Sequence, residues 1–160
     1  MPMSFDPYVH ERLIVIRLRH PSAETSAAMA KLIARRHRTL GAPLMFVLII
    51  GTDCPMPEPD ARRQLAADQA ALGERCFCTR TVILGPQMRQ GLVRSLVTGF
   101  SMLPGRARPT IDGSIAELLE GVESTLGIDP GWLGAELIDE GLVTPQEAEW
   151  RPEAAVQHTS

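Results

Sequence analysis

A continuous apolar run, PLMFVLII at residues 43–50, constrains the fold of this chain more than any other feature. A strand with one face in water alternates apolar and polar residues, whereas a strand covered on both faces is apolar throughout. The run has the length of a strand, and it ends at a proline-rich turn, GTDCPMPEP at residues 51–59. It therefore predicts a central strand of a parallel sheet with helices on both faces.

The segments around this run alternate between strand and helix patterns. Predicted strands are residues 12–19 (RLIVIRLR), 79–84 (TRTVIL) and a short edge strand at 107–111. Predicted helices run from Ser22 to Gly41, from Pro59 to Gly73, over residues 86–103, and from the capping box that starts at Ser114. The fold class is predicted as α/β, with a single mixed or mostly parallel sheet of four to five strands and helices packed on it.

Beyond Gly127 the pattern changes to short acidic helices. Asp129-Pro130 starts one helix, and the capping box Thr144-Pro145-Gln146-Glu147 starts another. This segment is too apolar for an unattached tail, so four of its residues are predicted to contact either the domain or a partner: Trp132, Leu133, Leu137 and Trp150. The chain is thus divided into an α/β domain (1–127), an acidic helical appendage (128–150) and a disordered tail (151–160).

Charge also divides the chain, between residues 111 and 112. Residues 1–111 carry 15 Lys/Arg against 8 Asp/Glu, a net +7, whereas residues 112–160 carry 1 against 11, a net −10. We expect the acidic part to pack near the basic part. A nucleic-acid partner is disfavoured, because the densest basic run (residues 35–38) ends a helix and only four Phe and one Tyr could stack on bases.

The size and the N-terminus predict a cytoplasmic domain. The 160 residues are enough for one buried core, and no apolar run approaches the roughly 20 residues that span a bilayer. The N-terminus, MPMSFDPYVHERL, does not have the pattern of a secretory signal. We therefore expect no membrane span.

Side chains that could carry chemistry are few. Cys54, Cys76 and Cys78 are expected as reduced thiols, and neither they nor the histidines have the spacing of a metal site. No nucleophile elbow, phosphate loop or dinucleotide fingerprint is present. Cys54, which precedes a helix start, is the one candidate for a thiol-dependent enzyme, and its competing interpretation is a small apolar residue in a turn. No catalytic residue, metal or cofactor is therefore predicted.

The order of RLIVIRLR, LMFVLII, the turn into PDARRQLA, TRTVILG and the closing SIAELLEGV helix resembles the STAS-like superfamily over residues 8–125. That superfamily includes the sporulation anti-sigma-factor antagonist. The resemblance implies a non-enzymatic module that binds other proteins through the loop and helix after the central strand. In phosphoregulated members this helix begins with a serine, whereas here Glu58 or Pro59 occupies that position and Thr52 is the only hydroxyl residue between Gly51 and Arg63.

The sequence thus favours a regulatory protein-protein interaction module that is not switched by phosphorylation at this loop. Its predicted partner-binding residues are Thr52, Asp53, Glu58, Asp60, Arg62 and Arg63. The partner is another protein of unknown identity or a second copy of the chain, and the appendage either docks in cis or recruits that partner. One alternative is a small apolar ligand or lipid binding protein with the helix at 86–103 lining its cavity. Another is the thiol-dependent enzyme that uses Cys54.

Overall fold

The computed structural model describes residues 4–56, 58–85, 91 and 110–151, and for residues 62, 65–66 and 69–71 it describes the backbone alone. The predicted tail from residue 152, most of the helix at 86–103 and most of the edge strand at 107–111 lie outside the described residues.

Five strands form one sheet in the order β1-β2-β3-β4-β5, which is also their order in the chain. They are β1 (Phe5–His10), β2 (Leu13–Leu18), β3 (Leu44–Ile50), β4 (Cys76–Ile83) and β5 (Thr110–Asp112). Only β1 and β2 pair antiparallel, and the other three neighbouring pairs are parallel. The predicted α/β class with a mostly parallel sheet is therefore confirmed.

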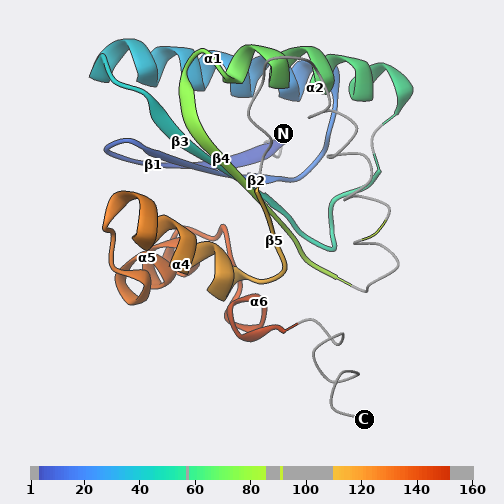
Figure 1. Ribbon diagram of the computed structural model, residues 1–160. Helices are drawn as coiled ribbons and strands as arrows, with labels where there is room; N and C mark the ends of the chain where they lie inside the picture. The colour runs from blue at the N-terminus through green and yellow to red at the C-terminus, as the bar shows by residue number, and fades with distance from the viewer. Residues whose placement is uncertain (1–3, 57, 86–90, 92–109, 152–160) are drawn as a thin grey trace.

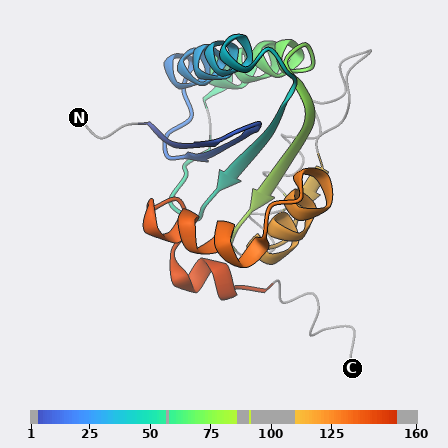
Figure 2. The ribbon, with the colours of Figure 1, turned by 90° about the vertical axis from the view of Figure 1, so that its left-hand side faces the viewer.

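The described helices form a layer on each face of the sheet, as Figures 1 and 2 show. The layer drawn above the sheet holds α1 (Ala23–Leu40) and α2 (Pro59–Leu72). The layer below it holds α4 (Ile115–Leu126), α5 (Pro130–Asp139) and α6 (Pro145–Glu149). All seven residues of β3 are buried, as the apolar run predicts for a strand covered on both faces.

Alternation along the strands divides the core into two apolar clusters. Ile14 and Ile16 of β2 lie in the cluster under α1, whereas Leu13 and Val15 lie in the cluster shared with α4 and α5. Arg17, the next residue on the second face, is also buried. The side chain of this arginine thus enters the face of the sheet that the C-terminal helices cover.

The segment predicted as an appendage contributes to the second cluster. Leu133, Leu137, Leu142 and Val143 are each at most 3% exposed and pack in the cluster that contains the residues of β2 and β3. Burying a Leu or Val side chain contributes about 1.5–3 kcal/mol to the free energy of unfolding, so α5 and the residues after it stabilise the fold. Residues 128–143 therefore share the core of the domain.

Strand β1 was not predicted from the sequence. It pairs with β2 at the edge of the sheet, and Pro7 stands opposite Ile16. A proline within a strand is found at sheet edges because it has no N–H to donate. Arg36 of α1 supports the turn between β1 and β2, since its guanidinium donates two hydrogen bonds to the carbonyl of Glu11, whose φ is 52°.

A second arginine, Arg80, is partly buried and joins β4, β5 and α4. The guanidinium of Arg80 makes a bidentate pair with Asp112, with N–O distances of 2.7 and 3.0 Å. Gly121 of α4 lies so close that a Cβ there would be 2.3 Å from Arg80 Cζ. The helix can therefore cover this ion pair only with glycine at position 121 unless the arginine moves.

Among the described residues, no helix is long and apolar enough to cross a membrane.

Candidate functional site

The candidate site lies at the carboxyl ends of β2 and β3. In parallel sheets this edge is where loops carry functional side chains. Here Arg17 and Arg19 come from the end of β2, Asp53 from the loop after β3, and Glu147 from α6. Residues separated by up to 130 positions in the chain thus meet at one edge of the sheet.

Arg17 is the centre of this cluster, and its side chain is 5% exposed. Its Nη1 donates to Glu147 Oε1 (2.5 Å) and to the carbonyl of Leu142 (3.0 Å). Its Nη2 donates to Glu147 Oε2 (3.0 Å) and to Asp53 Oδ1 (2.9 Å). The Nε atom is buried and has no hydrogen-bond partner among the described residues. The guanidinium therefore binds the C-terminal segment and the loop after β3 at the same time.

Arg19 extends the same connection toward solvent. Its Nη1 donates to Asp53 Oδ2 (2.8 Å), its Nε to Asp6 Oδ2 (2.7 Å) and its Nη2 to the carbonyl of Gly141 (3.1 Å). Asp53 thus divides its two oxygens between two arginines. Both arginines contact the loop through Asp53 and the C-terminal segment through backbone carbonyls, so the positions of these two segments are coupled.

Gly51 provides the space that the Arg17 guanidinium occupies. A Cβ at position 51 would lie 2.2 Å from Arg17 Nη2 and 2.7 Å from Asp53 Oδ1. These distances are far inside van der Waals contact, and both atoms belong to the charged cluster. A larger residue at position 51 is therefore incompatible with the arginine in this position.

The cluster changes the pKa of its members in the directions that stabilise charge. Burial would raise the pKa of Glu147, but hydrogen bonds from Arg17 and from the Thr144 backbone outweigh it and hold that pKa below its ordinary value. Burial would also raise the pKa of Asp53, but hydrogen bonds from Arg17 and Arg19 outweigh this effect and lower it. Burial would lower the pKa of Arg17, but Glu147 and Asp53 raise it.

The loop beyond Asp53 exposes most of the residues predicted to bind a partner. Thr52, Glu58, Asp60 and Arg63 are exposed, and Asp60 makes an exposed ion pair with Arg63 at 3.2 Å. The side chain of Arg62 lies outside the described part of the chain. Met56, which no residue pattern singled out, is 46% exposed in the same loop.

Of the four residues predicted as appendage contacts, two lie in the core and two lie nearer the surface. Leu133 and Leu137 are 1% exposed. Trp150 is partly buried against the second cluster. Trp132 is 42% exposed, and its ring lies 4.9 Å from that of His10 at the end of β1. The segment 128–150 is thus docked in cis.

Cys54 occupies a turn and points into the first core cluster. It is 4% exposed, its Sγ donates to the carbonyl of Pro55 (3.6 Å), and its backbone N–H donates to Gly51 O (3.2 Å). Burial raises the pKa of Cys76 to about 12 and also raises that of Cys78. These environments suit apolar side chains more than reactive thiolates. Within the described residues, no group of three or more His, Cys, Asp or Glu could hold a metal ion.

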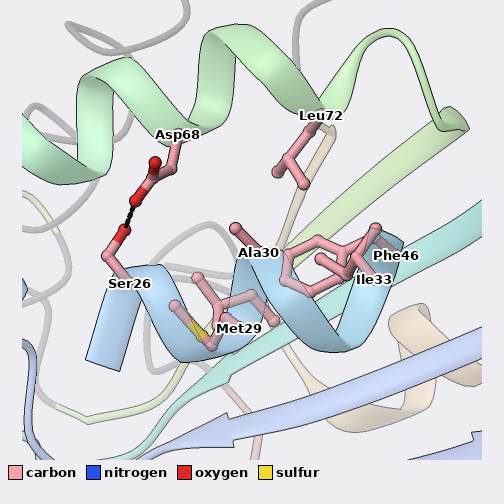
Figure 3. Close-up of a pocket in the computed structure, with 8 residues that line it drawn as sticks. Ser26, Met29, Ala30, Ile33, Phe46, Asp68 and Leu72 are labelled. Carbon is pink, nitrogen blue, oxygen red and sulfur yellow. Dashed lines mark hydrogen bonds between the residues drawn. The ribbon is translucent and has the colours of Figure 1, made fainter. Parts of the chain in front are cut away.

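A small cavity lies between α1, α2 and β3 (Figure 3). Its volume is about 30 Å³, and its lining includes the apolar residues Met29, Phe46 and Leu72. Ser26 and Asp68, which are joined by a hydrogen bond, line its other end (Figure 3). A space of this size is on the scale of one water molecule, whereas pockets for drug-sized ligands enclose about 300–1,000 Å³.

The sequence contained one signal for the arginine cluster that was not used. In RLIVIRLR, Arg17 and Arg19 follow Leu13 and Val15 in strict alternation, so all four side chains leave the same face of a buried strand. A buried arginine requires a carboxylate partner. The acidic C-terminal segment is then the natural source, but the choice of Glu147 among its acids depends on the tertiary fold.

No family model matches this chain, and no curated protein matches it closely enough to count as a relative. The resemblance to the STAS-like superfamily therefore stays a prediction from residue patterns.

Proposed function

We propose that this protein is a cytoplasmic, non-enzymatic module that binds another protein through the loop at residues 52–60 and the first turn of α2. The observation that carries the proposal is the exposed side chain of Met56, two residues after the part of the loop that Asp53 and Cys54 hold in place. Loops held by a rigid scaffold are common binding elements, and methionine adapts to apolar sockets of different shapes.

The base of the loop is fixed from both sides of the sheet. Asp53 accepts hydrogen bonds from Arg17 and Arg19 on one side, and Cys54 is buried in the first core cluster on the other. A loop that is already ordered loses little conformational entropy when it binds. This pre-organisation supports a binding role for the exposed residues that follow Cys54.

The chemistry of the exposed residues indicates the kind of partner. Met56 needs an apolar socket, and the neighbouring Glu58 and Asp60 favour a basic rim around it. A central apolar anchor with a charged rim is the usual arrangement of a protein-protein contact. The same two acids place negative charge near the start of α2, where a phosphoserine would place it in phosphoregulated STAS-like proteins. We therefore propose that binding at this loop does not require phosphorylation.

A photo-crosslinking amino acid at position 56 tests this function in cells that produce the protein. The matched control carries the same amino acid at Leu40, an exposed apolar residue at the end of α1, which is 37% exposed. We expect one protein to crosslink at position 56 and not at position 40. Purified, it should bind Met56→Ala roughly tenfold more weakly than the original chain, or about 1.4 kcal/mol.

Equal crosslinking at both positions, or equal affinity for Met56→Ala, would contradict the proposed binding surface. Stoichiometric phosphorylation of Thr52 that changes partner binding would contradict constitutive binding.

The two alternative functions have less support. The cavity beneath α1 and α2 is too small for a lipid, and the helix predicted to line an apolar pocket lies outside the described residues. The thiol-dependent enzyme would require Cys54 to react with solvent-borne substrates, but its side chain lies in the core cluster. Alkylation of Cys54 faster than a model thiol at neutral pH would revive that alternative.

A further inference from the structure

The Arg17 guanidinium is built as a receptor for a carboxylate. It lies at the carboxyl end of β2, and both of its terminal nitrogens donate to the Glu147 carboxylate: Nη1 to Oε1 at 2.5 Å and Nη2 to Oε2 at 3.0 Å. Such bidentate pairs are the strongest and most geometrically specific contacts between arginine and carboxylate. Gly51 leaves the room that this arrangement needs, and within the described part of the chain the buried Nε has no acceptor.

Glu147, which occupies this position, belongs to α6, the shorter of the two described helices of the C-terminal segment. Helix α6 has five residues and no buried residue. Isolated helices shorter than about 12–15 residues are marginal in water, so α6 depends on its capping box and on its contacts with the rest of the domain. Leu142 and Val143, immediately before it, are buried in the core. If residues from Thr144 onward separated from the sheet edge, α5 would keep its buried side chains, and Ala148 and Trp150 would lose their packing on the second cluster.

The local charge selects a monoanion. Arg17 and Arg19 contact three carboxylates, those of Asp6, Asp53 and Glu147, which leaves a net charge of −1. Without Glu147 the four remaining groups sum to zero. Another carboxylate restores the original balance, whereas a phosphate dianion would add one more negative charge beside Asp53.

We propose that the Arg17 guanidinium is a carboxylate-binding site that Glu147 occupies in cis and that an acidic side chain of a protein partner occupies when α6 separates. This inference rests on the proposed function, because it gives the partner of the 52–60 loop a second contact. Asp53 joins both sites: it binds Arg17 and Arg19 and forms the base of the loop. A partner that replaces Glu147 would therefore contact the receptor and the loop together.

Chemical rescue tests the site without any partner. Glu147→Ala removes the carboxylate and leaves space, whereas Glu147→Gln removes the charge but fills the space. We expect both variants to melt below the original chain. Sodium formate or acetate at about 200 mM should raise the melting temperature of Glu147→Ala by roughly 2–4 °C more than sodium chloride at equal ionic strength. Glu147→Gln and the original chain should show no such difference between salts.

A matched control and a second ligand sharpen the result. Glu149→Ala alters an exposed acid of the same helix that makes no ion pair within the described residues, so it should behave as the original chain. Phosphate should rescue Glu147→Ala less than formate does. A synthetic peptide of residues 141–151 should stabilise Glu147→Ala at lower concentration than acetate, and the same peptide with Gln in place of Glu147 should not.

Several outcomes would overturn the proposal. Equal responses of Glu147→Ala and Glu147→Gln to formate would show that no carboxylate enters the space. If the peptide stabilises Glu147→Ala only at the concentrations that acetate needs, Arg17 and Glu147 form an internal ion pair and not a binding site for a partner. If Glu147→Ala does not fold in chloride, recovery of the folded state in formate supports the site, and failure in both salts rejects it. The crosslinking result at position 56 is independent of all these measurements.

Discussion

Gly51→Ala is expected to destabilise the protein through Arg17 rather than through the backbone. Gly51 does not have a φ in the left-handed region, so alanine is not strained there by its own backbone. The added Cβ would instead lie 2.2 Å from Arg17 Nη2 and 2.8 Å from Arg17 Cζ. The guanidinium has to move, and its hydrogen bonds to Glu147 and Asp53 lengthen or break.

The size of the effect follows from those hydrogen bonds. A hydrogen bond to a charged group contributes about 1.5–3 kcal/mol, and breaking a buried ion pair costs about 3–5 kcal/mol. Because Arg17 can shift within the cluster, we expect Gly51→Ala to lower the free energy of unfolding by about 2–4 kcal/mol. For a chain of this size that corresponds to a fall in melting temperature of roughly 5–12 °C.

A double-mutant cycle measured by urea denaturation decides whether Arg17 is the cause. In an Arg17→Met background the guanidinium is absent, so Gly51→Ala should cost less than about 1 kcal/mol. Asp53, whose side chain is 47% exposed, can move away from the new methyl group. If Gly51→Ala costs the same with and without Arg17, the steric argument is wrong.

Three further outcomes follow from the same contacts. The pKa values of Glu147 and Asp53 are lowered in the folded state, so both groups stabilise the fold at a pH above their ordinary pKa values of 4.5 and 3.8. The stability advantage of the original chain over Glu147→Gln, measured by denaturation at each pH, should therefore shrink as the pH falls below about 4.5. Gly121→Ala should cost only about 1–2 kcal/mol in denaturation, because helix propensity offsets part of the displacement of Arg80. With its pKa near 12, Cys76 should be alkylated at least 100-fold more slowly in the native protein than in denaturant, by mass spectrometry.

Local patterns were enough to predict most of the described scaffold. The apolar run predicted β3, and the caps at Ser22, Ser114 and Thr144 predicted where three helices begin. These signals depend on residues within a few positions of each other. Strand β1 was not predicted because Asp6 and Pro7 interrupt the apolar pattern of a strand. Its pairing with β2 holds it in the sheet in spite of that weak pattern.

The arginine cluster could not be predicted in the same way. Asp53 was expected to contact a partner, yet it binds Arg17 and Arg19, 36 and 34 positions away. Residues 128–150 hold six acids, and only the turn between α5 and α6 brings Glu147 to Arg17. Such pairs depend on the tertiary arrangement, so a sequence can indicate that a buried arginine needs an acid but not which acid it finds.

The pairs Arg17 with Gly51 and Arg80 with Gly121 also restrict how this chain can diverge. In each pair the glycine tolerates a side chain only after the arginine has been lost or displaced. Substitution of the arginine first removes the counter-charge of Glu147 or of Asp112, and substitution of the glycine first displaces the guanidinium. Either order passes through a less stable intermediate, so we expect a homologous chain to retain both members of a pair or to have replaced both.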